Sequence, residues 1–328
     1  MAKELLQVRD LSVRYQNMRE TVYAVNGISF TVNRGETLGI VGETGAGKTT
    51  TARSILNLFR NGVSRRVTGS IRYDGRELTS LSEQDMAQIR GNKIAMIFQD
   101  PMTSLNPVLT VEDQIGEVIQ VHTQLGRAEV SDMVDRLLIT VGLSPRRKAE
   151  YPHQMSGGMR QRVCIAMALA CRPELLIADE PTTALDVTIQ AQVLNLMEQL
   201  KQEYQMSMLL ITHDLGVVAK MCDKVAVMYG GELLEYGPVE DIFRKDSNHP
   251  YTRGLFASLP AIGSGAGRLH PIEGQMPDPT HRTPGCSFAP RCAFCGDRCT
   301  KEKPGETYSG QHWIRCFESE QKHVSDGI

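Results

Sequence analysis

Residues 37–49 read Thr-Leu-Gly-Ile-Val-Gly-Glu-Thr-Gly-Ala-Gly-Lys-Thr, and this stretch decides the fold of the 328-residue chain. The run at 37–41 is typical of a buried strand, and the residues from 48 onward are typical of a helix. Between them, residues 42–49 fit the pattern G-x-x-x-x-G-K-[ST], whose glycines let backbone N–H groups turn toward a phosphate. The start of the following helix adds partial positive charge. The sequence therefore predicts a phosphate-binding turn between a strand and a helix.

The residues of this turn have separate expected tasks. Lys48 would reach the β and γ phosphates of a nucleotide, and the Thr49 hydroxyl would bind Mg²⁺. The rest of the loop and the first helical turn would surround the phosphates: Gly42, Glu43, Thr44, Gly45, Ala46, Gly47 and Thr50. A Gly-rich turn without a ligand is the structural alternative, and the strand and helix on the two sides disfavour it.

A second apolar run, residues 175–178, ends in the carboxylates Asp179 and Glu180. In a parallel sheet both acids would lie at the carboxyl edge, where ligands of α/β proteins bind. Asp179 would then hold Mg²⁺, usually through water, and Glu180 would orient and polarise the water that attacks the γ-phosphate. Many strands simply end in solvated acids, so this pattern is informative only together with the loop at 42–49.

The first 240 residues alternate short apolar runs with helical patterns, which predicts an α/β domain with a largely parallel sheet. Residues 208–212 read as another strand, and 225–228 and 232–235 as a hairpin around Gly230 and Gly231. Apolar residues recur at helix spacing over 127–141 and 187–204. From about residue 241 the sequence becomes rich in Pro, Gly, His and Cys, so we expect a domain boundary there.

The overall composition excludes several classes of protein. A net charge of −2 disfavours a dedicated nucleic-acid binder, which usually carries a basic excess. No apolar run approaches the roughly 18 residues needed to span a bilayer. The first residues mix acidic and basic side chains where a signal peptide would be apolar. We therefore expect a cytosolic protein with at most peripheral membrane contact.

Five of the eight cysteines fall within the last 43 residues: Cys286, Cys292, Cys295, Cys299 and Cys316. In a reducing cytosol such a cluster favours a metal site over disulfides. This tail is short and poor in apolar periodicity, so a bound metal would supply folding free energy that a small core cannot. Four thiolates could hold Zn²⁺ or an iron–sulfur cluster, and spacing alone does not choose between them.

Residues 156–162, Ser-Gly-Gly-Met-Arg-Gln-Arg, resemble the signature of ABC ATPases. The resemblance implies that Ser156, Gly157 and Gly158 face the γ-phosphate held by the other subunit of a dimer. Met155 and Met159 depart from the commonest LSGGQ form, and Met at the last position is familiar in the peptide-importer branch. Ser156 also fits a helix N-cap, which is compatible with the signature role.

Four further positions resemble elements of the same family, in the expected order. Gln99, after the apolar run 94–98, resembles the Q-loop glutamine that contacts Mg²⁺ and water. Asp186 resembles the D-loop aspartate, and it also fits an N-cap for the 187–204 helix. His213 resembles the switch histidine that contacts the γ-phosphate. Tyr15 lies where the family places an aromatic ring against adenine; the alternatives are that Tyr15 is a surface strand residue and that the nearby Tyr23 serves instead.

The resemblance covers residues 1 to about 260. It implies a RecA-like P-loop NTPase core at 1–240 with an inserted helical subdomain at about 105–170, followed by a small Cys-rich extension at 241–328. Its function would be hydrolysis of ATP sandwiched, with Mg²⁺, at a dimer interface. Glu180, His213, Gln99 and Lys48 would be the catalytic residues, and Thr49, Gln99 and Asp179 would serve Mg²⁺.

Residues 98–107, Phe-Gln-Asp-Pro-Met-Thr-Ser-Leu-Asn-Pro, and Asn248-His-Pro-Tyr251 resemble ATPases of the dipeptide, oligopeptide and nickel importers. The implied partners are a second related ATPase, two transmembrane permeases and an extracytoplasmic solute-binding protein. The chain would lie on the cytoplasmic side of the cell membrane. Several ATPases of this family carry a four-cysteine iron–sulfur cluster, expected here as [4Fe–4S], in this tail, and the family spacing matches Cys286, Cys292, Cys299 and Cys316. Cys295 is left as an extra thiol or an alternative ligand, and Zn²⁺ as the alternative metal.

The sequence disfavours other functions of ABC-type ATPases. ABC-type ATPases that act on DNA split the two halves of the site with a long coiled coil, whereas only 107 residues separate Lys48 from Ser156 here, without sustained heptads. Ribosomal ABC factors carry two ATPase halves in one chain, and this chain has one. A non-catalytic regulatory partner is disfavoured by the presence of Lys48, Asp179, Glu180 and His213.

Overall fold

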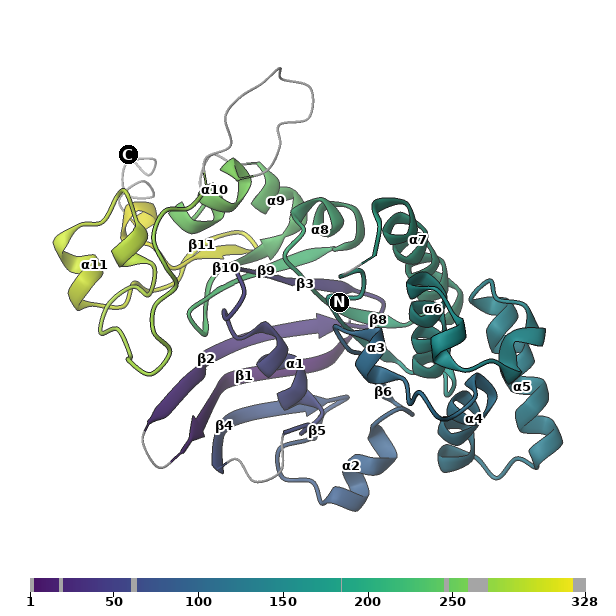
Figure 1. Ribbon diagram of the computed structural model, residues 1–328. Helices are drawn as coiled ribbons and strands as arrows, with labels where there is room; N and C mark the ends of the chain where they lie inside the picture. The colour runs from purple at the N-terminus through teal and green to yellow at the C-terminus, as the bar shows by residue number, and fades with distance from the viewer. Residues whose placement is uncertain are drawn as a thin grey trace. The chain divides into compact units, whose positions relative to one another are not determined.

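The computed structural model describes residues 3–17, 20–59, 64–183, 185–244, 248–258 and 271–320 (Figure 1). Two compact units emerge from the contacts of the chain, and each combines segments that are distant in sequence. The first unit comprises Met1–Leu5, Val32–Thr37 and Ser80–Ile211. The second comprises Leu6–Thr31, Leu38–Thr79 and Thr212–Ile328.

The second unit contains an antiparallel sheet. The sequence analysis predicted a largely parallel sheet and did not predict this one. Its strands are β1 (Glu4–Gln16), β2 (Thr21–Asn33), β4 (Ser64–Tyr73) and β5 (Arg76–Glu77), in the order β2-β1-β4-β5 (Figure 1). β1 and β4 pair antiparallel from Leu6 opposite Tyr73 to Gln16 opposite Ser64. Because β4 is mostly polar, the period-2 signal that marks such a strand is weak in the sequence.

A second sheet of this unit carries the predicted phosphate-binding turn. β3 (Thr37–Val41) pairs in parallel with β9 (Lys224–Tyr229), which forms a hairpin with β10 (Glu232–Pro238). Gly230 and Gly231 make the turn at φ of 55° and 80°, a region that glycine adopts without strain, so the predicted hairpin is confirmed.

The end of the chain adds two short strands to the same sheet. β12 (His312–Ile314) pairs with β10, and β11 (Thr307–Ser309) pairs with β12. Trp313, Ile314 and Phe317 are buried, so this tail has an apolar contact of its own. The helices of the unit are α1 (Lys48–Ile55), α8 (Leu215–Met221), α9 (Val239–Phe243), α10 (Pro250–Ala257), α11 (Asp297–Lys301) and the 3₁₀ turn η3 (Ala289–Arg291).

The first unit has a parallel three-stranded arrangement in the order β8-β7-β6, as the sequence predicted. Its strands are β6 (Ile94–Ile97), β7 (Leu175–Asp179) and β8 (Ser207–Thr212), whose residues are almost all buried. The helices are α2 (Glu83–Ile89), α3 (Pro101–Ser104), α4 (Val111–His122), α5 (Arg127–Thr140), α6 (Gly157–Leu169) and α7 (Val187–Tyr204), with 3₁₀ turns η1 (Pro145–Ala149) and η2 (Pro152–Gln154).

The helices α4, α5 and α6 pack on one another, and α6 also packs on α7 (Figure 1). Both helices predicted from apolar spacing are confirmed: the 127–141 pattern becomes α5, and the 187–204 pattern becomes α7 with Val193, Leu196 and Leu200 buried. Even the longest helix of the described chain, α7, lacks the apolar character of a membrane span, and so do the other described helices.

Candidate nucleotide site and cysteine cavity

The predicted phosphate-binding turn has the expected strand–loop–helix geometry within the second unit. α1 begins at Lys48, directly after Gly47 at φ of 103°. A Cβ atom on Gly47 would lie 2.4 Å from the carbonyl oxygen of Ala24, and one on Gly42 would lie 2.1 Å from that of Met228. These two positions therefore require glycine, because the loop passes directly against neighbouring backbone.

Lys48 is almost fully buried and lies along the loop that it follows. Its Nζ donates to the carbonyl oxygens of Gly42 at 2.6 Å and of Glu43 at 3.0 Å. The loop is also held by the hairpin turn, since the N–H of Gly231 donates to the carbonyl oxygen of Ala46 at 3.0 Å. These hydrogen bonds hold the loop in one conformation, with the Lys48 side chain bonded to the loop backbone.

Tyr15 and His213 belong to the same unit as this loop. Tyr15 lies half-buried near the end of β1, and its ring meets that of Phe59 edge to face with centroids 6.4 Å apart. His213 is exposed in the turn between β8 and α8. Asp214 caps α8 by accepting from the N–H groups of residues 216 and 217, which fixes the turn that carries His213.

Three predicted residues lie in the first unit at the carboxyl ends of its strands. Asp179 is the buried last residue of β7, and Glu180 follows it. Gln99 follows β6, and its Nε2 donates to Glu180 Oε2 at 3.0 Å. The Thr183 hydroxyl donates to the same oxygen at 2.9 Å. The parallel pairing of β6 with β7 therefore brings the predicted Q-loop glutamine onto the predicted catalytic carboxylate.

Glu180 has a backbone conformation that is rare for its residue type. Its φ is 48°, in the left-handed region, and its N–H donates to the carbonyl oxygen of Ile211 at 2.8 Å. Such a conformation costs free energy and is concentrated at functional sites, where the surrounding structure holds it. The strand pairing with β8 thus aims the carboxylate, a feature that no sequence pattern indicated.

The predicted signature and D-loop residues begin two neighbouring helices of the same unit. Ser156 caps α6, with its Oγ accepting from the N–H of Met159 at 3.4 Å, and Asp186 caps α7, with Oδ1 accepting from the N–H of Ile189 at 3.0 Å. Both N-cap predictions are confirmed. A Cβ atom on Gly158 would lie 2.6 Å from Cγ2 of Ile189, so the signature passes closely over the start of α7. Residue 184, beside the D-loop, lies outside the described residues.

Four of the five tail cysteines line a cavity of about 320 Å³ in the second unit. Its lining includes Cys286, Cys292, Cys299 and Cys316, which are the four predicted cluster ligands. Cys295 is exposed and does not line it. In the described part of the chain, no three His, Cys, Asp or Glu side chains are arranged closely enough to hold a single metal ion.

The wall of this cavity disfavours free thiolates and offers one buried hydrogen-bond donor. Burial raises the pKa of Cys286 to about 12 and that of Cys292 to about 11, so these thiols stay protonated at neutral pH unless a metal stabilises their thiolates. His249 also lines the cavity and is 1% exposed. Its Nδ1 accepts from the N–H of Tyr251 at 3.0 Å, and Nε2 has no hydrogen-bond partner among the described residues.

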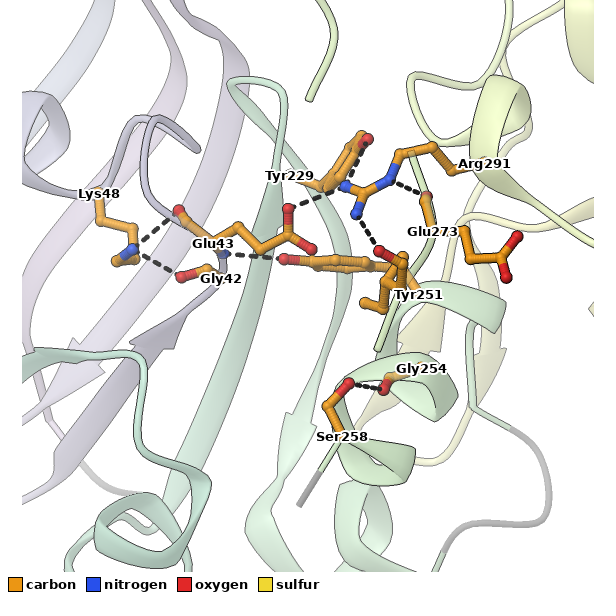
Figure 2. A network of polar contacts seen from close by, with 10 residues as sticks. Gly42, Glu43, Lys48, Tyr229, Tyr251, Gly254, Ser258, Glu273 and Arg291 are labelled. Atoms are coloured by element: carbon orange, nitrogen blue, oxygen red, sulfur yellow. Dashed lines mark hydrogen bonds and ion pairs between the residues drawn. The ribbon is translucent and has the colours of Figure 1, made fainter. Parts of the chain in front are cut away.

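A polar network beside the phosphate loop was not predicted (Figure 2). The N–H of Glu43 donates to the hydroxyl of Tyr251 at 2.9 Å, and the Glu43 carboxylate pairs with Arg291 Nη1 at 2.8 Å. Tyr251 belongs to the Asn248–Tyr251 element and Arg291 precedes Cys292. The sequence analysis singled out the Asn248–Tyr251 element and the cysteine tail, but nothing in the sequence linked Tyr251 or Arg291 to Glu43.

Comparisons with known proteins agree with these motifs. Residues 25–183 match the family model described as ABC transporter, and residues 234–299 match the one described as oligopeptide/dipeptide transporter, C-terminal region. The chain is 47% identical over 97% of its length to oligopeptide transport ATP-binding protein AppD of Bacillus subtilis, of which it covers 98%. It is 46% identical over 96% of its length to oligopeptide transport ATP-binding protein OppD of Salmonella typhimurium, of which it covers 94%.

Solved structures show the same cassette architecture. The chain resembles the dimeric ATP-binding cassette MJ0796 in a post-hydrolysis state with ADP and Pi, at a TM-score of 0.64 and 26% identity over 72% of this chain and 99% of that one. It also resembles cbiO1 of Clostridium perfringens, at a TM-score of 0.63 and 28% identity over 74% of this chain and 91% of that one.

Proposed function

The chain belongs to the ATP-binding subunits of oligopeptide and dipeptide ABC transporters, and from this premise we propose how its residues perform the work of that family. It is an ATPase of mixed α/β P-loop fold that energises peptide import. It works as part of an ATPase dimer with permease partners. We place it on the cytoplasmic face of the membrane, as a peripheral subunit.

The residues of the phosphate loop and the first turn of α1 bind ATP. Lys48, already held at the loop, would exchange its carbonyl contacts for phosphate oxygens, and the loop N–H groups would complete the cradle. Tyr15 supplies a half-exposed ring for adenine, next to Phe59. The remaining loop contacts come from residues 42–47, 49 and 50.

Mg²⁺, when bound, would neutralise charge on the β and γ phosphates. Thr49, Gln99 and Asp179 would hold it. These residues fit that ion chemically, since hydroxyl, amide and carboxylate oxygens are its usual ligands in proteins.

Glu180 orients and polarises the attacking water, and the observation that carries this role is its left-handed backbone with the carboxylate held by Gln99 and Thr183. These two donors fix the position of the carboxylate from which it would act on water. His213 would contact the γ-phosphate from its capped turn.

A second ATPase would complete the nucleotide site. Ser156, Gly157 and Gly158 would contact the γ-phosphate bound by the partner, and Asp186 would lie beside them, because Gly158 meets Ile189 at the start of α7. We propose a heterodimer with a related subunit, two permeases and an extracytoplasmic solute-binding protein.

The helices over about 105–170 would form the inserted subdomain that meets the permeases. The segment 98–107 would lie near the permeases. Phe98, at its start, is 38% exposed, so its ring is accessible to a partner.

The four cysteines that line the cavity would hold a [4Fe–4S] cluster within an extension at 241–328. Zn²⁺, the alternative, fits less well, because no three metal-binding side chains of the described residues are close enough for a single ion. The fit rests on the shared cavity and on the unpaired Nε2 of His249, which can donate to a sulfur. When bound, the metal would stabilise the thiolates and cross-link the tail.

Replacement of Glu180 by Gln tests the proposed hydrolytic role. Because Gln cannot polarise the attacking water as a carboxylate does, single-turnover hydrolysis in the assembled transporter should fall at least about 100-fold while ATP binding persists. Lys48→Ala is the matched control, since it should lose nucleotide binding itself. Unchanged hydrolysis by the Glu180→Gln complex would reject this role for Glu180.

A further inference from the structure

Glu43, the second residue of the phosphate loop, is held at its backbone and at its side chain by residues from the far end of the sequence (Figure 2). Tyr251 accepts the N–H of Glu43 at 2.9 Å, and Arg291 pairs with its carboxylate at 2.8 Å. The carbonyl oxygen of Glu43 accepts from Lys48. Three polar groups of one loop residue are thereby fixed, one of them by the lysine that serves the phosphates.

Both holding side chains are rigidly placed. The Arg291 side chain is 6% exposed, and it also donates to the carbonyl oxygens of Glu273 at 2.8 Å and Ile272 at 3.0 Å. Tyr251 is fully buried, with its ring 4.7 Å from that of Tyr229. Side chains locked by packing and by several hydrogen bonds can hold a partner in one position, which is what a site of fixed geometry requires.

The charge of Arg291 matters as much as its position. The Glu43 carboxylate belongs to a loop whose expected ligand is a polyanion, so an unpaired carboxylate there would repel the phosphates. The guanidinium cancels this charge while the carboxylate side chain remains only 28% exposed. Loss of Arg291 should therefore weaken nucleotide binding even where the loop keeps its shape.

We propose that Tyr251 and Arg291 are positioning residues of the ATP site, which hold Glu43 and make nucleotide affinity depend on the folded cysteine segment. Arg291 ends η3 and directly precedes Cys292, a residue of the cavity wall. A change at the cavity that moves this turn would move the cation that neutralises Glu43. The inference rests on the ATP-binding role of the loop.

Equilibrium binding of AMP-PNP with Mg²⁺ to the full chain tests this proposal. Arg291→Ala should weaken binding about tenfold, the size expected for a lost charge-assisted hydrogen bond. Tyr251→Phe, which removes only the acceptor of the Glu43 N–H, should weaken binding roughly threefold. In the assembled transporter KM for ATP should rise in both variants with a smaller change in kcat.

The double variant Glu43→Gln/Arg291→Ala separates the loss of charge neutralisation from general damage to the fold. Removing the carboxylate removes the repulsion that Arg291→Ala creates, so affinity should return to within about threefold of the wild type. Arg315→Ala is the matched control, because it deletes a half-buried arginine of the same tail that pairs with Glu306 at 2.7 Å. The affinity of the Arg315→Ala chain for AMP-PNP should equal that of the wild type.

The outcomes are distinct. A wild-type chain that does not bind AMP-PNP would overturn the ATP site itself. Wild-type affinity in a folded Arg291→Ala chain, or no recovery in the double variant, would overturn this inference alone. If Arg291→Ala fails to fold, Tyr251→Phe decides: wild-type affinity in that variant contradicts the proposal, and a roughly threefold loss supports it.

Discussion

At the scale of single residues, the order of motifs along the chain indicated which side chains should act on ATP. It did not indicate their conformations. Glu180 was expected from two acids at a strand end. Its backbone bond to Ile211 and its bond from Gln99 depend on the neighbouring strands β8 and β6, whereas the bond from Thr183 is local. The aim of the carboxylate is therefore a tertiary property, although the identity of the residue is a sequence property.

His249 provides a test of acid stability at the same scale. Burial, and secondarily the charge of Arg253, lowers the pKa of His249 to about 3. Below pH 6.5 the unfolded chain binds a proton at this histidine and the folded chain does not, so stability is lost as pH falls from 6.5 toward 3. Between pH 7 and 5 this loss should reach about 2 kcal/mol.

His249→Asn keeps a side-chain acceptor for the N–H of Tyr251 at the start of α10 and removes the titrating group. The difference in free energy of unfolding between pH 7 and pH 5 should therefore be smaller in the variant. Urea unfolding of both chains at the two pH values measures it. Equal differences in the two chains would contradict the assignment of this pH dependence to His249.

At the scale of elements, local sequence signals located helix starts well. Ser156 and Asp186 were expected to cap helices, and they do. The caps are local because each side chain bonds an N–H three residues ahead. The close approach of α6 to α7 at Gly158 involves residues 31 positions apart, and only the packed structure reveals it.

Gly158→Ala tests this approach. Its Cβ would lie 2.6 Å from Cγ2 of Ile189, a stiff β-branched side chain, so the overpacking should cost about 1–3 kcal/mol of stability. Gly157→Ala is the matched control, since its Cβ would be 3.5 Å from the nearest atom, and the better helix propensity of Ala could add up to about 1 kcal/mol. Thermal unfolding compares them, and equal stability of the two variants would refute the contact.

At the scale of the whole molecule, the cysteine cavity combines residues over a span of 31 positions, from 286 to 316. We predict that the full chain, purified without oxygen, contains about four irons and four sulfides. Cys299→Ser should lower the iron content, because Cys299 lines the cavity, whereas the exposed Cys295→Ser should not. Iron and sulfide analysis with visible absorption measures both, and loss of iron in Cys295→Ser would assign the ligands differently.

The sequence by itself determined the phosphate-binding turn, the order of the ATPase elements, the buried strands β7 and β8, and the ends of α7. These features depend on spacing and on contacts between near neighbours, which a linear pattern records. The antiparallel β1–β4 pairing and the contacts of Tyr251 and Arg291 with Glu43 were decided only by the tertiary structure. Arg291 lies 248 positions from Glu43, and packing of the intervening chain, which no local pattern encodes, brings them together.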